Sequence, residues 1–570
     1  MDKVKSMPEM KKSKKILTLF LLYAVIFLNA CVDKPESFEV RIEVNVARTK
    51  GEVSHFWRFF GADEPNYAYM TDGRKLLGEL GELRSGEVYF RAHNLLTTGA
   101  GTHALKWGST NAYTEDEKGN PVYYWAILDS IFDAYLENGV RPYVEIGFMP
   151  EALSINPEPY RHYWNPDLPY DKVYTGWAYP PKDYKKWEEL VFQWASHCVE
   201  RYGKEEVEQW YWETWNEPNI GYWQGTVEEF LMLHDHAING VLRALPTARA
   251  GGPDVAGHGG QYMRQFIEHC LSGTNYATGE KGTKLDFLAF HAKGQPDFDN
   301  GTVRMNMAPQ LGGIDKGFRL IASYPQISGI PVIIGECDPE GCAACQGDRL
   351  GYRNGTMYSS YTAATFPRIL DLAERHHINL EGVLTWAFEF ENQPWFAGFR
   401  SLATNGVNKP VMNVFRMFSM MDGQRIEVYS DGEIPLDTII HESVRVKPDV
   451  SAFASYDGKR LFIMIWHYYD CDLPGPDARI SLEINNLPVS SGSAGMSCFL
   501  VDRRHSNSYT TWLEMGSPRE PDPGTYAVLE KSGRLEQTVQ NKKVRISDSK
   551  AKVELELERQ GVAMVVLEFQ

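Results

Sequence analysis

Two glutamates follow apolar, strand-like runs, and together they could perform acid–base and nucleophilic chemistry. Glu217 comes after residues 210–215, whose aromatic and β-branched side chains are typical of a buried strand that Pro218 ends. Glu336 ends the β-branched run 332–336, 119 residues further on. Hydrolysis of a glycosidic bond by the common route needs such a pair, with one carboxyl protonated near neutral pH and the other ionised. The plainer alternatives are a surface loop at Glu217 and a strand-end salt bridge at Glu336.

A barrel of alternating strands and helices would bring the two carboxylates together, because residues at the carboxyl ends of its strands share one face. Strand-like runs are predicted at residues 56–60, 88–95, 142–148, 210–215, 249–255, 286–291, 331–336 and 382–390. Helical patterns lie between them and are clearest at residues 124–136 and 183–202. We therefore expect an α/β fold, a (β/α)8 TIM barrel that spans residues 54–421.

The remainder of the chain predicts a second unit of antiparallel strands. After about residue 422 helical patterns largely vanish, and Asp457-Gly458 between two apolar runs indicates a hairpin. Further strand patterns lie at residues 480–487, 553–557 and 562–567. These patterns favour a β-sandwich over residues 422–570. The alternating segment 38–46 has no helix after it, so residues 31–53 are expected to form a tether and a strand that joins this sandwich.

Residues 1–30 are predicted to be a lipoprotein signal peptide and are excluded from the fold. Four lysines precede an apolar run of thirteen residues, 16–28, which is short for a membrane span. Leu28-Asn29-Ala30-Cys31 then resembles a bacterial lipoprotein cleavage box. We expect lipidation of Cys31, which would anchor the protein to a membrane in the bacterial periplasm or at the cell surface. An uncleaved signal anchor is the alternative.

The composition argues against some partners and leaves others open. Without residues 1–30 the chain has 52 basic and 73 acidic residues, a net charge of −21, which disfavours nucleic acid and anionic membrane surfaces. Aromatic residues make up 13% of the chain, which fits either core packing or sugar-stacking walls. Cys342 and Cys345 are a close pair without a nearby fourth ligand for zinc, so a loop disulfide or free thiols are favoured.

Several motifs together resemble glycoside hydrolase family 39 of clan A, the family of β-xylosidases and α-L-iduronidases. The motifs are Asn216-Glu217-Pro218, Phe56-Trp57-Arg58, Phe148-Met149-Pro150-Glu151-Ala152-Leu153, Pro474-Gly475-Pro476-Asp477-Ala478 and His505-Ser506-Asn507-Ser508-Tyr509. They lie between about residues 54 and 525 and so cover most of the chain. The resemblance implies retaining hydrolysis of O-glycosidic bonds in an oligosaccharide or polysaccharide, with no metal and no organic cofactor.

The resemblance also assigns roles to the two glutamates and their neighbours. It makes Glu217 the general acid/base and Glu336 the nucleophile, with carboxyls roughly 5–5.5 Å apart. Asn216 would hold the sugar 2-hydroxyl, a contact that strengthens as the oxocarbenium-like state develops. Arg91 would orient Glu336 and keep it ionised.

Four further residues would line the pocket if the resemblance holds. Trp386, placed on the eighth strand, would form the floor beneath the sugar ring, and Phe148 would be part of the wall. His93 and His291 would bind sugar hydroxyls. The alternatives are that both aromatic residues belong to the core and that both histidines are buried and satisfied by other groups.

Two departures from the β-xylosidase pattern bear on the substrate. The first is Lys293, two residues after His291 in His291-Ala292-Lys293-Gly294 at the end of the sixth strand. The second is Asp338, two residues after the expected nucleophile in Glu336-Cys337-Asp338-Pro339. Both stretches look more like the α-L-iduronidases, in which a lysine helps bind the substrate carboxylate. Lys293 would fill that role, Arg400 would be a second cation and Glu391 a further substrate-binding residue. Lys293 could instead pair with Asp338, Glu389 or Glu391.

The interpretation that these observations favour is a retaining exo-glycosidase that releases terminal β-D-xylose-type residues. An α-L-iduronidase-like enzyme, or another glycosidase directed at a uronic acid or L-arabinopyranose, is the alternative within the same mechanism. An alternative of another class is a non-catalytic, carbohydrate-binding surface lipoprotein. The oligomeric state and the role of the β-domain stay open.

Overall fold

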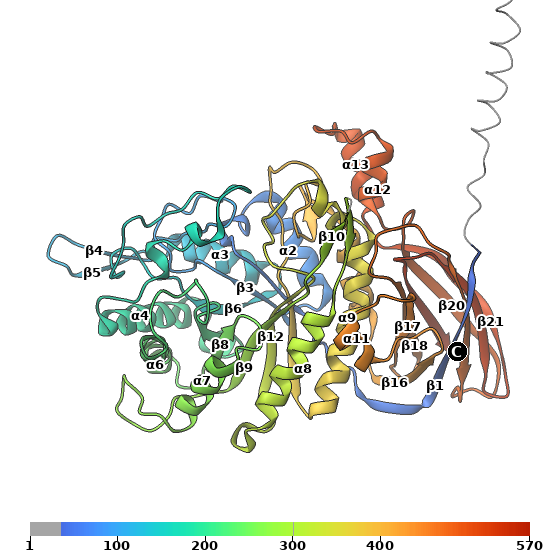
Figure 1. Cartoon of the computed structure of the whole chain (residues 1–570), viewed down its shortest axis with the longest axis horizontal. Coiled ribbons are helices and arrows are strands. Elements are labelled where there is room, and N and C mark those ends of the chain that lie inside the picture. Colours follow the sequence, from blue (N-terminus) through green and yellow to red (C-terminus); the bar gives the residue numbers. More distant parts are fainter. Residues whose placement is uncertain (1–35, 300, 570) are drawn as a thin grey trace, which may run out of the picture.

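The computed structural model describes residues 36–299 and 301–569, which form a barrel and a large β-sheet side by side (Figure 1). The predicted signal peptide and Cys31 lie outside the described residues. Among the described helices, none is long and apolar enough to cross a membrane.

Eight parallel strands of the described chain close into a barrel, which confirms the predicted (β/α)8 fold. The strands are β2 (Phe59–Ala62), β3 (Val88–Ala92), β6 (Val140–Ile146), β7 (Tyr211–Thr214), β8 (Arg249–Val255), β9 (Phe287–Lys293), β12 (Pro331–Asp338) and β13 (Asn379–Thr385). They are neighbours in chain order, and β13 pairs with β2 to close the ring. Nearly all their residues are buried, because side chains fill the barrel and helices cover its outside.

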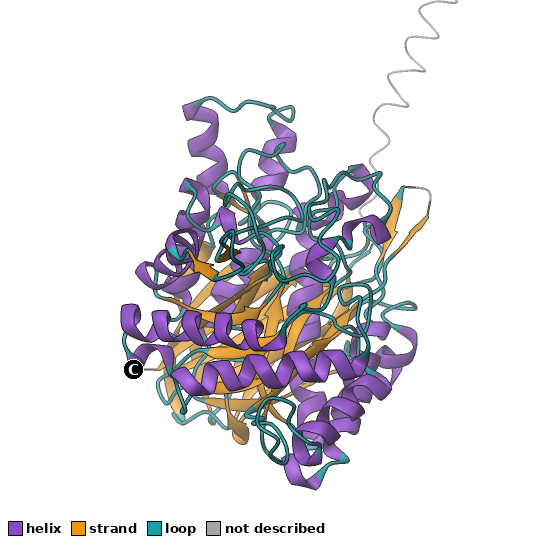
Figure 2. Ribbon diagram, turned by 90° about the vertical axis from the view of Figure 1, so that its left-hand side faces the viewer, coloured by secondary structure: helices purple, strands orange, loops and turns teal. Residues whose placement is uncertain are grey.

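Helices lie around the strands of the barrel (Figure 2), and two of them begin at capping residues that the sequence carries. The main ones are α2 (Thr71–Leu83), α3 (Ala126–Glu137), α4 (Tyr184–Tyr202), α6 (Val227–Ala244), α7 (Gly260–Ser272), α8 (Ala308–Ala322), α9 (Thr356–His376) and α10 (Pro410–Met420). Asp183 caps α4 by accepting from two backbone N–H groups. Thr226 and Glu229 form a capping box at the start of α6.

The eighth strand ends earlier than the sequence pattern predicts. β13 stops at Thr385, so Trp386 is the first residue after the strand rather than a residue on it. The backbone N–H of Trp386 donates to the Asp338 carboxylate at 3.1 Å instead of to a neighbouring strand. A side chain of β12 therefore ends the ladder and fixes the position of Trp386.

The second unit is a nine-stranded sheet of the described chain, in the order β21-β20-β23-β18-β17-β16-β1-β19-β22. Its strands are β1 (Phe38–Glu52), β16 (Gln424–Ser430), β17 (Asp449–Tyr456), β18 (Arg460–Tyr468), β19 (Ala478–Asn485), β20 (Ser491–Val501), β21 (Glu536–Ser547), β22 (Ala551–Leu557) and β23 (Val562–Phe569). The edge strands β21 and β22 contact each other, so the sheet curls around its own apolar core. β1 lies inside this sheet, antiparallel to β16 and parallel to β19.

Three short helices of the described chain lie among the strands after residue 422, which agrees with the expectation that helical structure largely vanishes there. They are α11 (Leu436–Glu442), α12 (Ser508–Glu514) and α13 (Pro523–Ser532). Asn507 caps α12, and Asp522 followed by Pro523 begins α13. Each helix is ten residues or shorter, so the apolar periodicity is too brief to stand out in the sequence.

Candidate active site

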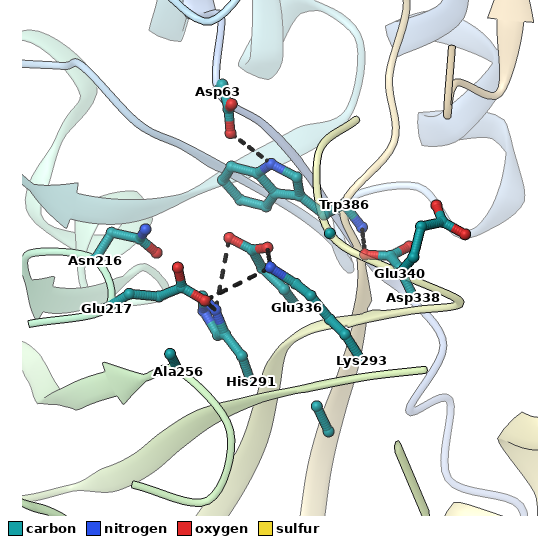
Figure 3. Close-up of polar contacts among 12 residues, drawn as sticks. Asp63, Asn216, Glu217, Ala256, His291, Lys293, Glu336, Asp338, Glu340 and Trp386 are labelled. Carbon is teal, nitrogen blue, oxygen red and sulfur yellow. Dashed lines mark hydrogen bonds and ion pairs between the residues drawn. The ribbon is translucent and has the colours of Figure 1, made fainter. Parts of the chain in front are cut away.

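Glu217 and Glu336 meet at the carboxyl ends of two barrel strands (Figure 3). Glu336 lies within β12, and Glu217 follows the end of β7 by three residues. Glu217 has a positive φ of 44°, and its N–H donates to the Asp254 carbonyl at 3.0 Å. Asn219 exchanges two further hydrogen bonds with the backbone of Ala256, at 2.8 and 3.0 Å. The loop that carries Glu217 is therefore fixed against the end of β8.

The two carboxylates are close together and nearly buried. One oxygen of each carboxylate and a ring nitrogen of His291 all lie within 4.8 Å of one another. Glu217 is 8% exposed and Glu336 is 3% exposed. This proximity confines the chemistry to a narrow space that a single sugar ring could span.

Lys293 lies between the two carboxylates. Its Nζ contacts Glu336 and lies 3.6 Å from Glu217 Oε1 (Figure 3). The predicted alternative, a pairing of Lys293 with Asp338, Glu389 or Glu391, is therefore wrong in this structure. Lys293 follows His291 by two residues on β9, so both side chains point to the same side of the strand and into the site.

His291 bridges two carboxylates. Its Nδ1 lies 2.8 Å from Glu217 Oε1, and its Nε2 lies 3.2 Å from Asp254 Oδ1. Glu336 Oε1 is a further 3.7 Å from Nδ1. The ring thus contacts both predicted catalytic residues in the absence of any sugar.

His93 and Trp386 are held from the opposite side by Asp63. Asp63 Oδ1 accepts from Trp386 Nε1 at 2.7 Å and lies 3.2 Å from His93 Nδ1. His93 Nε2 is 3.6 Å from Glu336 Oε1. In Figure 3 the Glu336 carboxylate lies between Trp386 and His291, so the indole faces the pocket as a floor residue would.

Arg91 lies behind the site, within a cage of acidic groups. Its guanidinium contacts Glu213, and it lies 3.0 Å from Glu145 and 2.9 Å from Asp254. Glu336 is more distant, at 3.9 Å. Arg91 therefore reaches the predicted nucleophile only weakly and lies among three buried acids. It lowers the pKa of Asp254, whereas burial raises the pKa of Glu213 well above its usual range and that of Glu145 to about 7.

Glu145, Glu213 and Asp254 were missed by reasoning from sequence alone. Each is fully buried on a barrel strand made mostly of apolar residues. A buried carboxylate is costly without a partner, so an acid inside an apolar run is the signal that could have identified them.

Asn216 and the aromatic wall complete the pocket. Asn216 Oδ1 accepts from Arg91 at 3.2 Å, while its buried Nδ2 has no hydrogen-bond partner among the described residues. The Phe148 ring lies 4.4 Å from the Trp177 ring and 5.9 Å from the Tyr222 ring, measured between centroids. The space left beside this wall is about 10 Å³, room for about one water.

Arg400 and Glu391 are not placed as substrate-binding residues would be. Arg400 is 0% exposed and contacts Asp338 at 3.5 Å and Glu340 at 3.2 Å. Glu391 accepts from the backbone N–H of Asp72 in the first turn of α2 at 2.8 Å. Both side chains are engaged by these partners, and neither contacts Glu217 or Glu336 among the described residues.

The Cys342–Cys345 disulfide lies in the loop that follows β12. The two Cα atoms are 5.4 Å apart. Arg353 donates to the carbonyls of Cys342, Cys345 and Gly398, at 3.0 to 3.3 Å. This settles the choice between a disulfide and free thiols for this pair.

The charges around the glutamates shift their pKa values downward. Burial raises the pKa of Glu336, but Lys293 and then His291 outweigh it and hold that pKa well below its usual range. The same balance of burial against Lys293 and His291 lowers the pKa of Glu217. Both carboxyls are therefore ionised while Lys293 remains between them, and an ammonium in that position also repels a divalent cation.

Comparisons with known proteins agree with this architecture. The family model described as "Glycosyl hydrolases family 39" matches residues 40–534. A β-xylosidase from Caldicellulosiruptor saccharolyticus is 24% identical over 490 residues, covering 84% of this chain and 88% of the relative. An α-L-iduronidase from Mus musculus is 24% identical over 537 residues, covering 88% and 76%. The crystal structure of the GH39 enzyme from Xanthomonas axonopodis pv. citri superposes with a TM-score of 0.71 at 20% identity, covering 95% of this chain and 99% of that one.

Proposed function

Since the chain belongs to glycosyl hydrolases family 39 and is a glycoside hydrolase, we propose that it acts by a retaining double displacement on terminal β-D-xylose-type residues of a glycan. The observation that carries the mechanism is the closeness of Glu217 and Glu336, with one oxygen of each no more than 4.8 Å apart. Retaining enzymes hold their carboxyls about 5–5.5 Å apart, whereas inverting enzymes leave about 6.5–9.5 Å for a water.

In the first half of the reaction, Glu336 attacks the anomeric carbon and Glu217 protonates the departing oxygen. In the second half, Glu217 removes a proton from the water that displaces Glu336 from the sugar. Lys293, and besides it His291 and His93, lower the pKa of Glu336 and keep it ionised, as a nucleophile requires. Lys293 Nζ contacts Glu336 and lies 3.6 Å from Glu217, in the space that the anomeric carbon and the glycosidic oxygen must occupy, so entry of a sugar displaces Lys293 from between the carboxylates. That displacement removes the ammonium charge that holds the pKa of Glu217 down. The pKa of Glu217 then rises, as a proton donor requires.

The names of the relatives support a xylose-type substrate. Two β-xylosidases, at 24% and 25% identity, align with 84% and 76% of this chain. A pentopyranose has no substituent at C5, so it fits a site in which aromatic side chains and Lys293 leave little space.

Lys293 favours a second candidate, a glycosidase directed at a uronic acid. A neutral sugar that displaces Lys293 from Glu336 offers it no replacement anion, whereas a sugar carboxylate does. The α-L-iduronidase of Mus musculus, which aligns with 88% of this chain, carries that activity in its name. The two candidates share the mechanism and differ only in what Lys293 contacts when the site is filled.

The test is a panel of aryl glycosides: β-D-xyloside, α-L-arabinopyranoside, α-L-iduronide and β-D-glucuronide. We expect xyloside hydrolysis with retained anomeric configuration by ¹H NMR, and losses of roughly 10³-fold or more in Glu336→Gln and Glu217→Ala. Preference for a uronide that Lys293→Ala abolishes would replace the first candidate by the second. Binding of glycans without hydrolysis would contradict both and favour a binding lipoprotein.

We also propose that the protein is lipid-anchored through Cys31 outside the cytoplasm. The basic segment, short apolar run and Leu28-Asn29-Ala30-Cys31 support this proposal. Metabolic labelling with a radioactive fatty acid should mark the wild type and not Cys31→Ser. Equal labelling of both would contradict it.

A further inference from the structure

Asp254 and His291 form a chain of contacts that ends at Glu217. Asp254 Oδ1 lies 3.2 Å from His291 Nε2, and His291 Nδ1 lies 2.8 Å from Glu217 Oε1. Asp254 is 0% exposed and His291 is 1% exposed. The three side chains come from the ends of adjacent barrel strands β7, β8 and β9, so the barrel itself aligns them.

The arrangement fixes which nitrogen of His291 carries a hydrogen. Burial raises the pKa of Asp254, but Arg91 at 2.9 Å and His291 lower it below its usual value. An ionised carboxylate cannot donate a hydrogen, so the hydrogen that faces Asp254 belongs on Nε2 of His291, which lies 3.2 Å from Asp254 Oδ1 in an ion-pair contact rather than a well-aligned hydrogen bond. Nδ1 then faces Glu217 either as a donor to a carboxylate or as an acceptor from a carboxylic acid. One proton can thus move between His291 and Glu217 without changing the charge of the pair.

We propose that Asp254 is a positioning residue of the reaction, holding His291 so that the His291–Glu217 pair stores the proton that the leaving group receives. This inference rests on the proposed retaining mechanism. When the sugar displaces Lys293, the proton passes from Nδ1 to the Glu217 carboxylate and then to the glycosidic oxygen as its bond to the anomeric carbon breaks. The water that later attacks that carbon gives its proton to Glu217, and the pair is restored.

The backbone shows that space is reserved for the Asp254 side chain. A Cβ on Gly335 would lie 2.1 Å from Asp254 Oδ1 and 2.2 Å from Oδ2, so no other residue fits before Glu336. The Asp254 carbonyl also accepts from the Glu217 N–H at 3.0 Å. Asp254 therefore fixes the acid/base residue through its main chain and, by way of His291, through its side chain.

Other charged and titratable groups face the pair and set its proton affinity. They are Glu336 from β12, Lys293 from β9, Arg91 and His93 from the end of β3, and Tyr222 and Tyr174 from the aromatic wall. Burial lowers the pKa of His291, but Asp254 and then Glu336 raise it to about 10. Among these groups Asp254 raises the pKa of His291 most, and so it strengthens the binding of the proton by the His291–Glu217 pair.

The direction of the pH effect follows from the negative charge of Asp254. The active pair carries one proton, which is lost as pH rises through the pKa of the pair. Asp254→Asn removes a negative charge and should move the alkaline limb of kcat/KM to lower pH by about one unit or more. A purely structural defect would lower the profile without moving its limb.

The leaving group gives an independent readout. A dinitrophenyl glycoside leaves without protonation, whereas a methyl glycoside requires it. We expect Asp254→Asn to lower kcat/KM by roughly 10²-fold for the methyl glycoside and by less than about tenfold for the dinitrophenyl glycoside. The matched control is Asp235→Asn, because buried Asp235 on α6 lies 2.9 Å from His269 Nε2 in a similar pair away from the site. It should move neither the limb nor the ratio.

His291→Gln keeps the test decisive if Asp254→Asn does not fold, since Gln can hydrogen-bond Glu217 but cannot exchange a proton with it. It should show the same dependence on the leaving group. Equal losses for both glycosides with an unmoved alkaline limb, in whichever variant folds, would overturn the inference while leaving the mechanism intact. Absence of hydrolysis by the wild type would contradict the proposed function itself.

Discussion

Buried charges at single residues decide how this protein responds to pH. Glu389, which follows β13, is 1% exposed, and its Oε1 accepts from the Gly406 N–H at 2.7 Å. Its Oε2 has no hydrogen-bond partner in the described chain. Burial raises the pKa of Glu389 to about 8, helped by the nearby acids Asp72 and Glu391. This carboxyl is therefore mostly protonated at neutral pH.

Glu389→Gln should make stability less dependent on pH. When the pKa of a carboxyl is higher in the folded than in the unfolded protein, its contribution to stability is complete below the unfolded-state pKa. That contribution is lost as pH rises toward the folded-state pKa, here about 8. The neutral glutamine keeps the Gly406 contact without this loss. Urea unfolding should show equal stability below about pH 4.5, with the variant gaining about 1.4 kcal/mol per pH unit from there up to about pH 8. Parallel stability curves for the two proteins would show that Glu389 does not titrate in this range.

At the scale of elements, the barrel strands use glycine where another element approaches. Gly335 on β12 leaves room for the Asp254 carboxylate of β8, and Gly61 on β2 lies against Trp386, with a Cβ 2.5 Å from the indole carbons. Both positions lie near the carboxyl ends of their strands, where the site is built. Close packing of backbone against polar side chains is therefore part of how the barrel positions the site.

Gly335→Ala should lower both the stability and the activity. The added methyl must push Asp254 away from His291 and Arg91, at a stability cost of about 1–3 kcal/mol and an activity loss of roughly tenfold or more. kcat/KM and urea unfolding measure the two effects. The control is Gly313→Ala on α8, where no described atom lies within 4 Å of the new Cβ. This change should stabilise the helix by up to about 1 kcal/mol with unchanged kcat/KM.

At the scale of the whole molecule, the barrel and the sheet share one buried ion pair. Arg368 on α9 donates to both oxygens of Asp449 on β17, at 2.7 and 2.8 Å. Asp449 also accepts from Trp466 Nε1 at 2.7 Å. Arg368 is 3% exposed and Asp449 is 0% exposed, so each charge depends on the other. Because α9 also packs on β18 and β23, we expect the two units to unfold together.

Asp449→Ala should destabilise both units at once. It leaves the Arg368 charge buried and unpaired, at a cost of about 3–5 kcal/mol. Asp437→Ala on α11 is the control. Asp437 is 77% exposed and pairs with Arg375, which lies on α9 like Arg368, so this pair should contribute less than about 1 kcal/mol. Calorimetry should show one transition for the wild type and for both variants. Two separate transitions would mean that the units fold independently.

The sequence by itself determined the fold class and the two central residues. Strand and helix periods, cap residues and the Asp457-Gly458 turn are local signals, so the barrel and the hairpin between β17 and β18 could be predicted. Glu217 and Glu336 could be predicted to meet because one follows and the other ends a strand-like run. The eighth strand was misplaced, because the Asp338 side chain that ends it lies 48 residues away from Trp386.

Only the tertiary structure decided which charges meet. Lys293 contacts Glu336 and Glu217 rather than Asp338, Glu389 or Glu391, the alternative partners that the sequence left open, since barrel closure brings β7, β9 and β12 together. Asp254, Glu145 and Glu213 gain their partner Arg91 in the same way. Periodicity reports whether a side chain is buried, but not which residue from a distant strand will face it. The partners of buried charges, and with them the protonation of the site, therefore belong to the fold.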